Sequence, residues 1–298
     1  MDLLVLKENL KNISPIFIRK IIREILKCYR ETKNKVQLKY LGQDLREEDL
    51  LIALKQLGVK EGDILFVHSS LSRLGYVRGG ANTVLTALLK SVGSNGTLGA
   101  PTFWGFTANH LKGKLTFDVR HTPSLMGVIS EAIRTHPAAY RSMHPTHTAA
   151  FIGPLSEYLT QNHHLDNTPM GPNSPYIKLI ECRGKILLLG VTLEYLTNFH
   201  TIEDLVPNLP VDVYLKEPLI FTVIDEKGAS FKVSTYCHCP EAGKRRQCMK
   251  MKPYLLANHV MKEMQVKNAT LTLIDAYLLH ETLLSLYEKG ITMYSPGY

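Results

Sequence analysis

Short apolar runs alternate along the chain with longer segments whose apolar residues recur every three or four positions. Three of the runs, Ile64–Val67, Thr97–Ala100 and Ile186–Leu189, are each followed by a turn or loop signal and are predicted to be buried strands. Residues 46–57 and 81–92 have the spacing of amphipathic helices. An alternation of helices and buried strands is typical of an α/β protein.

The C-terminal third has a different pattern. Residues 219–225 and 230–236 alternate between apolar and polar positions around a turn, which predicts a β-hairpin. Residues 253–263 and 272–289 are predicted to be helices, and residues 169–178 are predicted to be a loop.

The N-terminal segment is predicted to carry a basic amphipathic helix over residues 14–30. Ser14-Pro15 is a typical helix start, and lysines and arginines fill the side opposite the apolar positions Ile18, Ile21, Ile22, Ile25 and Tyr29. Such a helix could contact an anionic membrane surface or a second subunit in a homodimer, or simply pack on the enzyme body. We therefore expect a basic extension over residues 1–44 and a catalytic domain over residues 45–298.

Composition excludes several classes of protein. The 298 residues are 45% hydrophobic and 21% charged, ordinary values for a soluble enzyme. The net charge is +8, but residues 1–40 hold ten Lys/Arg and four Asp/Glu, so +6 lies there and only +2 remains for the rest. A body this close to neutral does not indicate a nucleic-acid partner.

The apolar runs, the N-terminal charges and the cysteines bear on the cellular location of the protein and on whether it forms disulfides. Its apolar runs fall short of the roughly 20 residues that a membrane span needs. Charged residues interrupt the N-terminus throughout, unlike a secretory signal, so a cytoplasmic location is expected. Five unevenly spaced cysteines do not suggest a disulfide framework.

The strongest candidate chemistry lies just after the run Ile186–Leu189. Gly190 closes the run, and Thr197, His200 and Glu203 then follow at intervals of three. In a helical segment this spacing places the three side chains on one face. A histidine beyond the carboxyl end of a buried strand, with a carboxylate one turn away, suits a general base and its orienting partner. The alternative is an ordinary surface ion pair.

Other segments could surround a ligand. The run Ile64–Val67 leads into hydroxyl residues and glycines over 68–80, as expected of a loop that approaches a ligand closely. Ser124 is predicted to cap or precede a helix through about residue 134, whose free N–H groups would face an anion.

Two groups of possible metal ligands are weak. His144 and His147 are three residues apart, but Pro145 between them argues against a helix and favours a polar loop. Zinc at Cys237, Cys239 and Cys248 is conceivable, although their spacing fits no common zinc finger.

Several stretches, taken in order, resemble one known family. They are Val-His-Ser-Ser-Leu-Ser-Arg-Leu-Gly-Tyr-Val-Arg-Gly-Gly at 67–80, Gly-Ser-Asn-Gly-Thr-Leu-Gly-Ala-Pro-Thr-Phe at 93–103, Arg-His-Thr-Pro-Ser-Leu-Met-Gly at 120–127, Arg-Ser-Met-His-Pro-Thr-His-Thr-Ala-Ala at 141–150, Ser-Pro-Tyr-Ile-Lys-Leu at 174–179, and Leu-Leu-Gly-Val with Thr-x-x-His-x-x-Glu at 188–203. Over roughly residues 45–290 the chain resembles the aminoglycoside 3-N-acetyltransferase family.

The resemblance implies a three-layer α/β/α sandwich around a mixed central sheet, distinct from the common N-acetyltransferase fold. It also implies acetyl-CoA as co-substrate, a small-molecule amine as acceptor and no metal. Carried over by position, His200 is the general base and Glu203 its partner, and His147 and Asp204 bind substrate. The implied CoA-binding residues are His68, Ser69, Ser70, Leu71, Gly75, Val77, Thr102 and Ser124.

The acceptor remains open at this point. A pocket for polycationic aminoglycosides should be lined with carboxylates, and the candidates near in sequence are Asp166, Glu194, Asp204 and Asp212. Alternatives are an amino sugar of a surface glycan, a metabolite amine, or a non-catalytic protein that binds CoA or a partner.

Overall fold

The computed structural model describes residues 44–105, 113 and 115–294, together with five helical positions nearer the N-terminus. The chain divides into two compact units, Met1–Asp44 and Leu45–Tyr298. In the first unit the described helical positions are all exposed: Glu24, Ile25, Cys28, Tyr29 and Thr32. The other apolar positions predicted for the N-terminal helix, Ile18, Ile21 and Ile22, lie outside the described residues.

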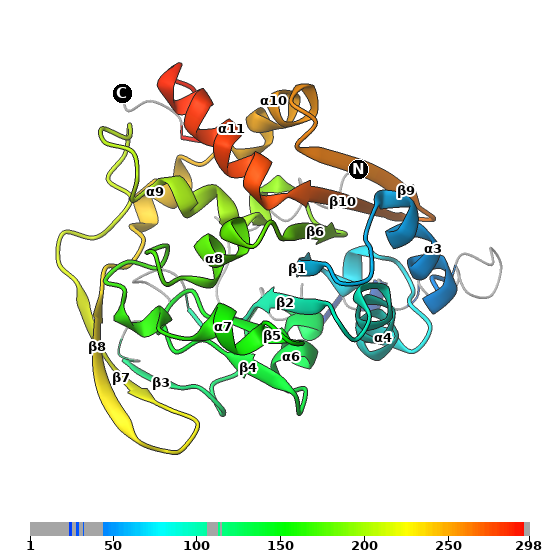
Figure 1. Cartoon of the computed structure of the whole chain (residues 1–298), viewed down its shortest axis with the longest axis horizontal. Coiled ribbons are helices and arrows are strands. Elements are labelled where there is room, and N and C mark those ends of the chain that lie inside the picture. Colours follow the sequence, from blue (N-terminus) through cyan, green and yellow to red (C-terminus); the bar gives the residue numbers. More distant parts are fainter. Residues whose placement is uncertain are drawn as a thin grey trace. The chain divides into compact units, whose positions relative to one another are not determined.

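The larger unit is built on a mixed sheet (Figure 1). Among the described residues this sheet has seven strands, in the order β4-β5-β2-β1-β6-β10-β9. Their bounds are β1 Ile64–Ser69, β2 Thr97–Pro101, β4 Ala139–Arg141, β5 Ala149–Ile152, β6 Lys185–Leu189, β9 Met261–Val266 and β10 Ala269–Asp275. The three strands predicted from apolar runs are therefore confirmed as β1, β2 and β6.

Those three strands form the parallel centre of the sheet. β1 pairs in parallel with both β2 and β6, whereas the outer strands pair antiparallel. In the β1–β6 register Ser69 lies opposite Leu189, so both strands end at the same level. The loops that leave them meet at this carboxyl edge, where open α/β sheets bind their ligands.

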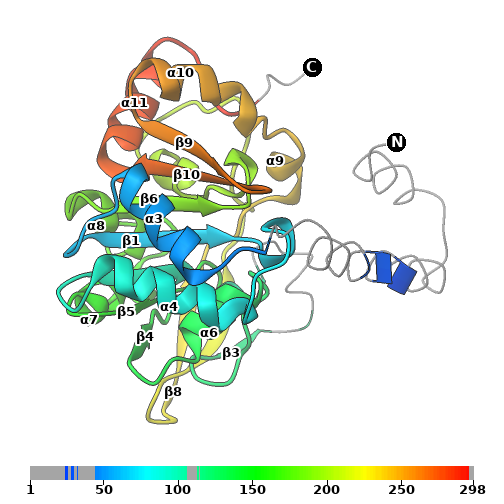
Figure 2. The ribbon, with the colours of Figure 1, turned by 90° about the vertical axis from the view of Figure 1, so that its right-hand side faces the viewer.

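Helices cover both faces of the sheet (Figure 2). One face packs against α3 (Glu47–Leu57), α4 (Gly80–Val92) and α6 (Val128–Arg134). The other packs against α8 (Pro175–Glu181) and α11 (Ala276–Glu288). The predicted α/β fold with a mixed central sheet between helical layers is confirmed.

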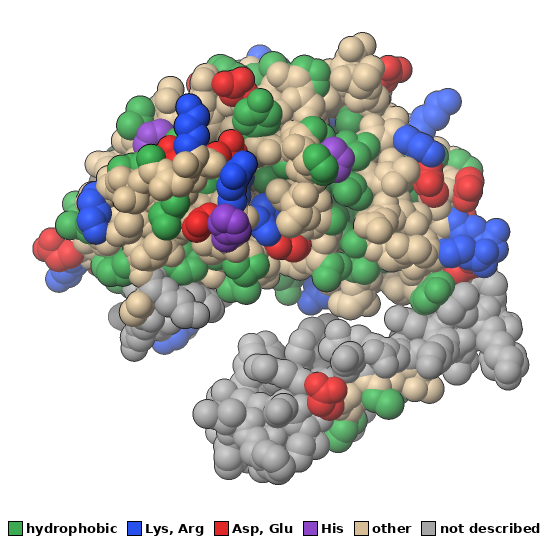
Figure 3. Space-filling view, turned by 90° about the horizontal axis from the view of Figure 1, so that it is seen from below, with side chains coloured by type: hydrophobic (Ala, Val, Ile, Leu, Met, Phe, Trp, Pro, Cys, Tyr) green, Lys and Arg blue, Asp and Glu red, His purple; other side chains and the backbone are tan. Residues whose placement is uncertain are grey.

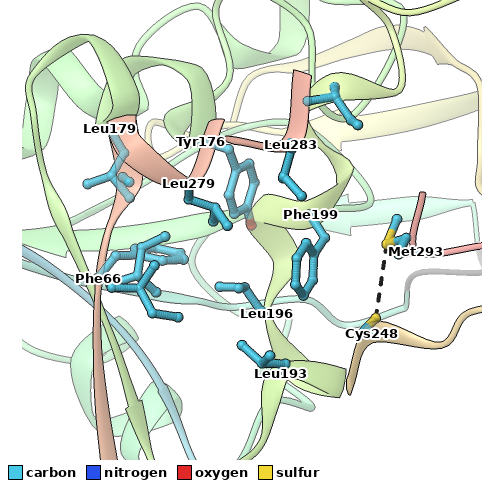
Figure 4. Packing of buried hydrophobic residues seen from close by; sticks show 14 of the residues in the cluster. Phe66, Tyr176, Leu179, Leu193, Leu196, Phe199, Cys248, Leu279, Leu283 and Met293 are labelled. Carbon is cyan, nitrogen blue, oxygen red and sulfur yellow. Dashed lines mark hydrogen bonds between the residues drawn. The ribbon is translucent and has the colours of Figure 1, made fainter. Parts of the chain in front are cut away.

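Residue alternation along β1 explains how one strand serves two cores. Leu65 and Val67 point to the side of α3 and α4, whereas Phe66 points to the side of α8 and α11. Figure 4 shows the second core, where Phe66, Tyr176, Phe199 and Leu279 pack together. Apolar burial of this kind stabilises a fold by about 25 cal/mol for each Å² removed from water.

A smaller sheet contains β3 (Thr116–Asp118), β7 (Leu219–Ile224) and β8 (Ser230–Thr235). β7 and β8 are antiparallel, which confirms the predicted hairpin. This sheet has its own core, with Trp104 and Phe117 stacked at a centroid distance of 6.2 Å.

Three sequence predictions are wrong. The helix predicted over 253–263 ends at Ala257 as α10 (Lys252–Ala257), and the rest enters β9. The helix predicted over 272–289 begins only at Ala276, because the preceding residues form β10. Short apolar runs suit a strand or a helix equally, and here the pairing of β10 with β6 selects the strand.

The loop predicted over 169–178 contains the start of α8, because the Ser174 hydroxyl accepts the N–H of Ile177 as an N-cap.

The remaining short helices are η1 Leu71–Arg73, α7 Ser156–Thr160, η2 His163–Leu165, η3 Leu193–Tyr195, η4 Thr197–Ile202, α9 Pro240–Lys244 and η5 Cys248–Met251. Within the described part of the chain, no helix combines the length and the apolar character needed to cross a membrane. On the face seen in Figure 3, basic and acidic side chains are interspersed.

Candidate active site

The segment after β6 carries the predicted catalytic pair. Gly190, at φ +71°, turns the chain out of the sheet where a Cβ would meet Leu74 at 2.8 Å. The chain then forms η4, a 3₁₀-helix with about three residues per turn. His200 and Glu203 are therefore in register, and Nδ1 of His200 lies 2.6 Å from Oε1 of Glu203.

Hydrophobic packing fixes the orientation of η4. Phe199 is buried in the same cluster as Leu279 and Leu283 of α11 (Figure 4). Its neighbour His200 consequently points away from this apolar core toward Glu203, and both side chains are buried. A histidine held in this way has a single ring orientation.

Glu203 is the hub of the cluster. Besides His200, its carboxylate receives Nε2–H of His238 at Oε2, at 2.8 Å, and the hydroxyl of Tyr294 at Oε1. Burial raises the pKa of the Glu203 carboxyl, but electrostatic attraction and hydrogen bonds from the N–H groups of His200 and His238 outweigh it and hold that pKa below its usual range. Glu203 is therefore a buried anion at neutral pH.

The second nitrogen of His200 faces Arg246. Nη1 of Arg246 lies 2.9 Å from Nε2 of His200. A guanidinium can only donate, so Nε2 accepts and Nδ1 carries the proton that is donated to Glu203. Burial lowers the pKa of His200, which Glu203 opposes and the charges of His238 and Arg246 reinforce. The imidazole is thus neutral at pH 7, with its lone pair on Nε2.

The two predicted substrate-binding residues lie in different surroundings. His147 is buried, and its ring centroid is 4.7 Å from that of His238, which in turn is 4.6 Å from that of His200. Burial, reinforced by the neighbouring histidines, lowers the pKa of His147 well below its usual value. Asp204 is exposed and accepts the Thr168 hydroxyl at 2.6 Å.

Three of the predicted CoA-binding segments meet at the carboxyl edge of β1 and β2. The Leu125 N–H donates to the carbonyl of Phe103 at 2.7 Å, which joins the segment before α6 to the end of β2. A Cβ on Gly127 would lie 3.9 Å from the carbonyl oxygen of Ser69, so the start of α6 lies beside the end of β1.

The individual CoA candidates differ in exposure. Ser69, Ser70 and Gly75 are partly exposed, and Gly75 has φ +81°. His68 is buried, which lowers its pKa to about 3, and its Nε2 has no hydrogen-bond partner among the described residues. Leu71 and Val77 pack against the core on the α3–α4 side.

Thr102 is fully buried, and its side-chain hydrogen bonds stabilise this edge of the sheet. Its hydroxyl lies 2.5 Å from that of Thr148 and accepts Nε–H of Arg141 at 3.2 Å. Ser124 does not cap a helix, since α6 starts at Val128 after Gly127. The Ser124 hydroxyl accepts Met126 N–H, and its own N–H donates to the Glu131 carboxylate.

A metal site is possible only in a different place from those considered in the sequence. His200, Glu203 and His238 offer donor atoms within 4.8 Å of one another. Each carboxylate oxygen of Glu203 already receives a histidine N–H, so the cluster is assembled by hydrogen bonds alone. In the described part of the chain the cysteines considered for zinc form no such group, and all three thiols are free.

Sequence reasoning missed three members of the cluster. His238, Arg246 and Tyr294 lie 35, 46 and 91 residues from the partners they contact. A backbone bridge joins Arg246 to Tyr294, and Cys248 contacts Met293 at 4.0 Å (Figure 4). No spacing rule links such distant positions, although His238 lies between Cys237 and Cys239, two of the cysteines considered for zinc.

A neutral, carboxylate-oriented histidine at the carboxyl edge of an α/β sheet has the geometry that general-base chemistry in group-transfer enzymes requires. The family model for aminoglycoside 3-N-acetyltransferase matches residues 66–288. The chain therefore belongs to the aminoglycoside 3-N-acetyltransferase family.

Individual relatives agree. The chain is 36% identical over 172 residues to aminoglycoside N(3)-acetyltransferase III of a Salmonella species, a match covering 52% of this chain and 60% of that protein. The chain thus spans about three-fifths of the length of the curated relatives it matches.

Solved structures share the fold. Aminoglycoside acetyltransferase AAC(3)-Xa aligns with a TM-score of 0.73 and 26% identity, over 84% of this chain and 94% of the other. AAC-IIIb in binary complex with CoASH aligns with a TM-score of 0.71 over 85% and 99%, and at 24% identity this likeness concerns the fold alone.

Proposed function

We propose that the domain over residues 45–298 transfers an acetyl group from acetyl-CoA to a primary amine of an aminoglycoside or amino sugar, with His200 as general base oriented by Glu203. The observation that carries the proposal is the 2.6 Å contact between His200 Nδ1 and Glu203 Oε1, which leaves the lone pair of His200 on Nε2. Family membership supports the acetyl donor and the amine acceptor.

The chemistry follows from that lone pair. An ammonium cannot attack a thioester, so a proton must leave the amine. That first proton goes to solvent. His200 Nε2 then takes a second proton from the neutral amine as its nitrogen bonds to the carbonyl carbon of the acetyl group. The C–S bond then breaks, and the imidazolium returns the proton to the CoA thiolate. Glu203 stabilises the imidazolium while it exists, because it is a buried anion in direct contact.

The loop at 68–77, with Ser124 and Thr102 behind it, is the proposed binding site for CoA. His68, Ser69, Ser70 and Gly75 would contact the pantetheine arm, and Leu71 and Val77 would hold the loop on the core. The unpaired, buried Nε2 of His68 supports a ligand at this edge, since buried polar atoms normally have partners.

The acceptor side would lie near His147 and Asp204, on the other side of the histidine cluster. The names of the curated relatives support an aminoglycoside, and an amino sugar remains the second acceptor class. Residues 14–30 are proposed to form a contact with a second subunit or an anionic membrane surface, a role that the exposure of Ile25 and Tyr29 supports.

A free-thiol release assay tests the proposal. Purified protein is incubated with acetyl-CoA and, in turn, gentamicin, paromamine, glucosamine and small alkyl amines. We expect amine-dependent CoA release, an acetylated product of the matching mass, and a rise in melting temperature on adding CoA. Thermal stabilisation by CoA without turnover of any amine would contradict the catalytic role.

A further inference from the structure

The side chain of Arg246 is hydrogen-bonded to Nε2 of His200, the atom that has to accept the proton. Its Nη1 donates to Nε2 of His200 at 2.9 Å, so the lone pair needed for catalysis is engaged in this state. The Arg246 side chain is half-buried, and its Nε is buried without a hydrogen-bond partner among the described residues. Within the described part of the chain, no carboxylate lies within 4 Å of its guanidinium.

The backbone around Arg246 is held firmly. A β-bridge pairs it with Tyr294, and the Gln247 N–H donates to the carbonyl of Met293 at 2.7 Å. Residue 246 therefore stays beside the catalytic histidine, while the long side chain can exchange partners. A guanidinium with a buried unpaired N–H, and no counter-ion, is an incomplete anion site.

Three of the four carboxylates that the sequence suggests for a polycation accept hydrogen bonds within the protein, whereas Asp212 is exposed. Glu203 is bound by two histidines, and Asp166 accepts both the backbone N–H and the side-chain amide of Asn173. Glu194 accepts the N–H of Met249, and Asp204 accepts the Thr168 hydroxyl.

The segment carrying Arg246 is basic as well. Residues 240–252 contain five Lys/Arg and one Asp/Glu, a net charge of +4. Two of the lysines are paired, Lys244 with Glu241 and Lys252 with Glu263. Charge of this sign beside the base repels an acceptor bearing several ammonium groups and attracts one bearing an anion.

We propose that the preferred acceptor is an amino sugar carrying a phosphate or carboxylate near its amine, and that this anion draws the Arg246 guanidinium away from His200 Nε2. The inference rests on the proposed function and names the substrate class of that site. Binding of the acceptor then has two effects. The planar guanidinium of Arg246 binds the anion, and Nε2 of His200, no longer bonded to Arg246, faces the amine. The phosphates of CoA cannot serve instead, because the whole pantetheine arm separates them from the reacting sulfur.

The test compares matched acceptors. We measure kcat/KM for glucosamine, glucosamine 6-phosphate, glucosamine 1-phosphate, 2-amino-2-deoxyglucuronic acid and gentamicin. We expect the best anionic acceptor to exceed glucosamine by about 10- to 100-fold, the effect of a charged hydrogen bond. The phosphate and carboxylate compounds show which anion is recognised. Gentamicin or glucosamine matching or exceeding every anionic acceptor would overturn the inference while leaving acetyl transfer intact.

Variants locate the effect. Arg246→Gln, which keeps a donor without the charge, should remove the preference for the anionic acceptor, and Arg246→Lys should retain part of it. Lys244→Gln removes the same charge two residues away, at an exposed position, and should retain all of it. Equal preference in Arg246→Gln and the parent protein would contradict the assignment.

A readout without turnover separates this inference from the proposed function. The pKa of His200 is followed by NMR as the pH is varied, in the parent protein and in Arg246→Gln. The arginine charge lowers that pKa, so the variant should show a higher value, and inorganic phosphate should raise it in the parent protein only. If no amine is acetylated, the proposed function fails, and this titration with phosphate still decides whether Arg246 binds an anion.

Discussion

Two arginines near the carboxyl edge of the sheet, the buried Arg141 and the half-buried Arg246, have opposite surroundings. Arg141 donates from Nε to the hydroxyls of Thr102 and Thr148, from Nη1 to the carbonyls of Val119 and Thr122, and from Nη2 to the carbonyl of Thr102. Among the described residues, the side chain of Arg246 has one hydrogen-bond partner, Nε2 of His200, and its buried Nε has none.

The difference distinguishes an arginine that stabilises the fold from one whose polar atoms are available to a ligand. A saturated network such as that of Arg141 is rigid and stabilises the segments it joins. A network with unpaired polar atoms leaves those atoms free to bind a ligand. Around η4, the atoms without a partner among the described residues include Nδ1 of His238 and the side-chain amide of Asn198. Buried polar groups without partners call for such an explanation, because native proteins contain few of them.

The largest effect is expected at the base itself. His200→Ala should lower the rate of acetyl transfer by about 10²–10⁴-fold, the usual contribution of a general base, while CoA binding stays nearly unchanged. Steady-state thiol release and calorimetric CoA binding check the two parts. His121→Ala is the control. The side chain of His121 is exposed, and His121 is far from His200 and Glu203 in the sequence. A His200→Ala rate within threefold of the parent would exclude the assignment.

Removing the saturated arginine should affect folding rather than chemistry. Arg141→Ala leaves the carbonyls of Thr102, Val119 and Thr122 without this donor, which we expect to lower the free energy of unfolding by about 3 kcal/mol. Denaturant melts measure this, with the exposed Arg120→Ala as the matched control, expected within about 0.5 kcal/mol of the parent. An unchanged midpoint for Arg141→Ala would show that the network contributes little.

Buried neutral histidines should make the protein acid-sensitive. The folded-state pKa values of His68 and His163 are lowered by burial to about 3, from 6.5 in the unfolded chain. The unfolded state therefore binds more protons below pH 6.5, and the free energy of unfolding falls as pH falls through that window. Urea melts at several pH values between about 7 and 4 test this. A midpoint that stays flat would mean that these histidines charge without cost.

The smallest effect on catalysis is expected from deleting residues 1–44. The body should stay folded, with kcat little changed, and should lose association with a second subunit or an anionic surface. Sedimentation of both forms at low and high salt, with and without anionic vesicles, separates the cases, because salt screens an electrostatic contact. Unfolding of the truncated protein would show that the extension belongs to the core.

The sequence predicts what is local and misses what is distant. The strands β1, β2 and β6 and the His200–Glu203 pair follow from apolar runs and from a spacing of three within one segment. Parts of β9 and β10 fall within segments predicted as helices, because their mixed apolar and polar residues become strands only through tertiary pairing, β10 with β6 and β9 with β10. His238, Arg246 and Tyr294 join the cluster through tertiary contacts, which leave no periodic signal along the chain.

The pH dependence of kcat/KM, compared between the parent protein and Glu203→Gln, tests most directly whether His200 is the base that Glu203 orients. The rate should fall on the acidic side as His200 takes up a proton. Glu203 raises the pKa of His200, so replacing it with a neutral amide should move the acidic limb to lower pH and reduce the maximal rate less than His200→Ala does. An acidic limb that does not move would show that the two side chains are not coupled in catalysis.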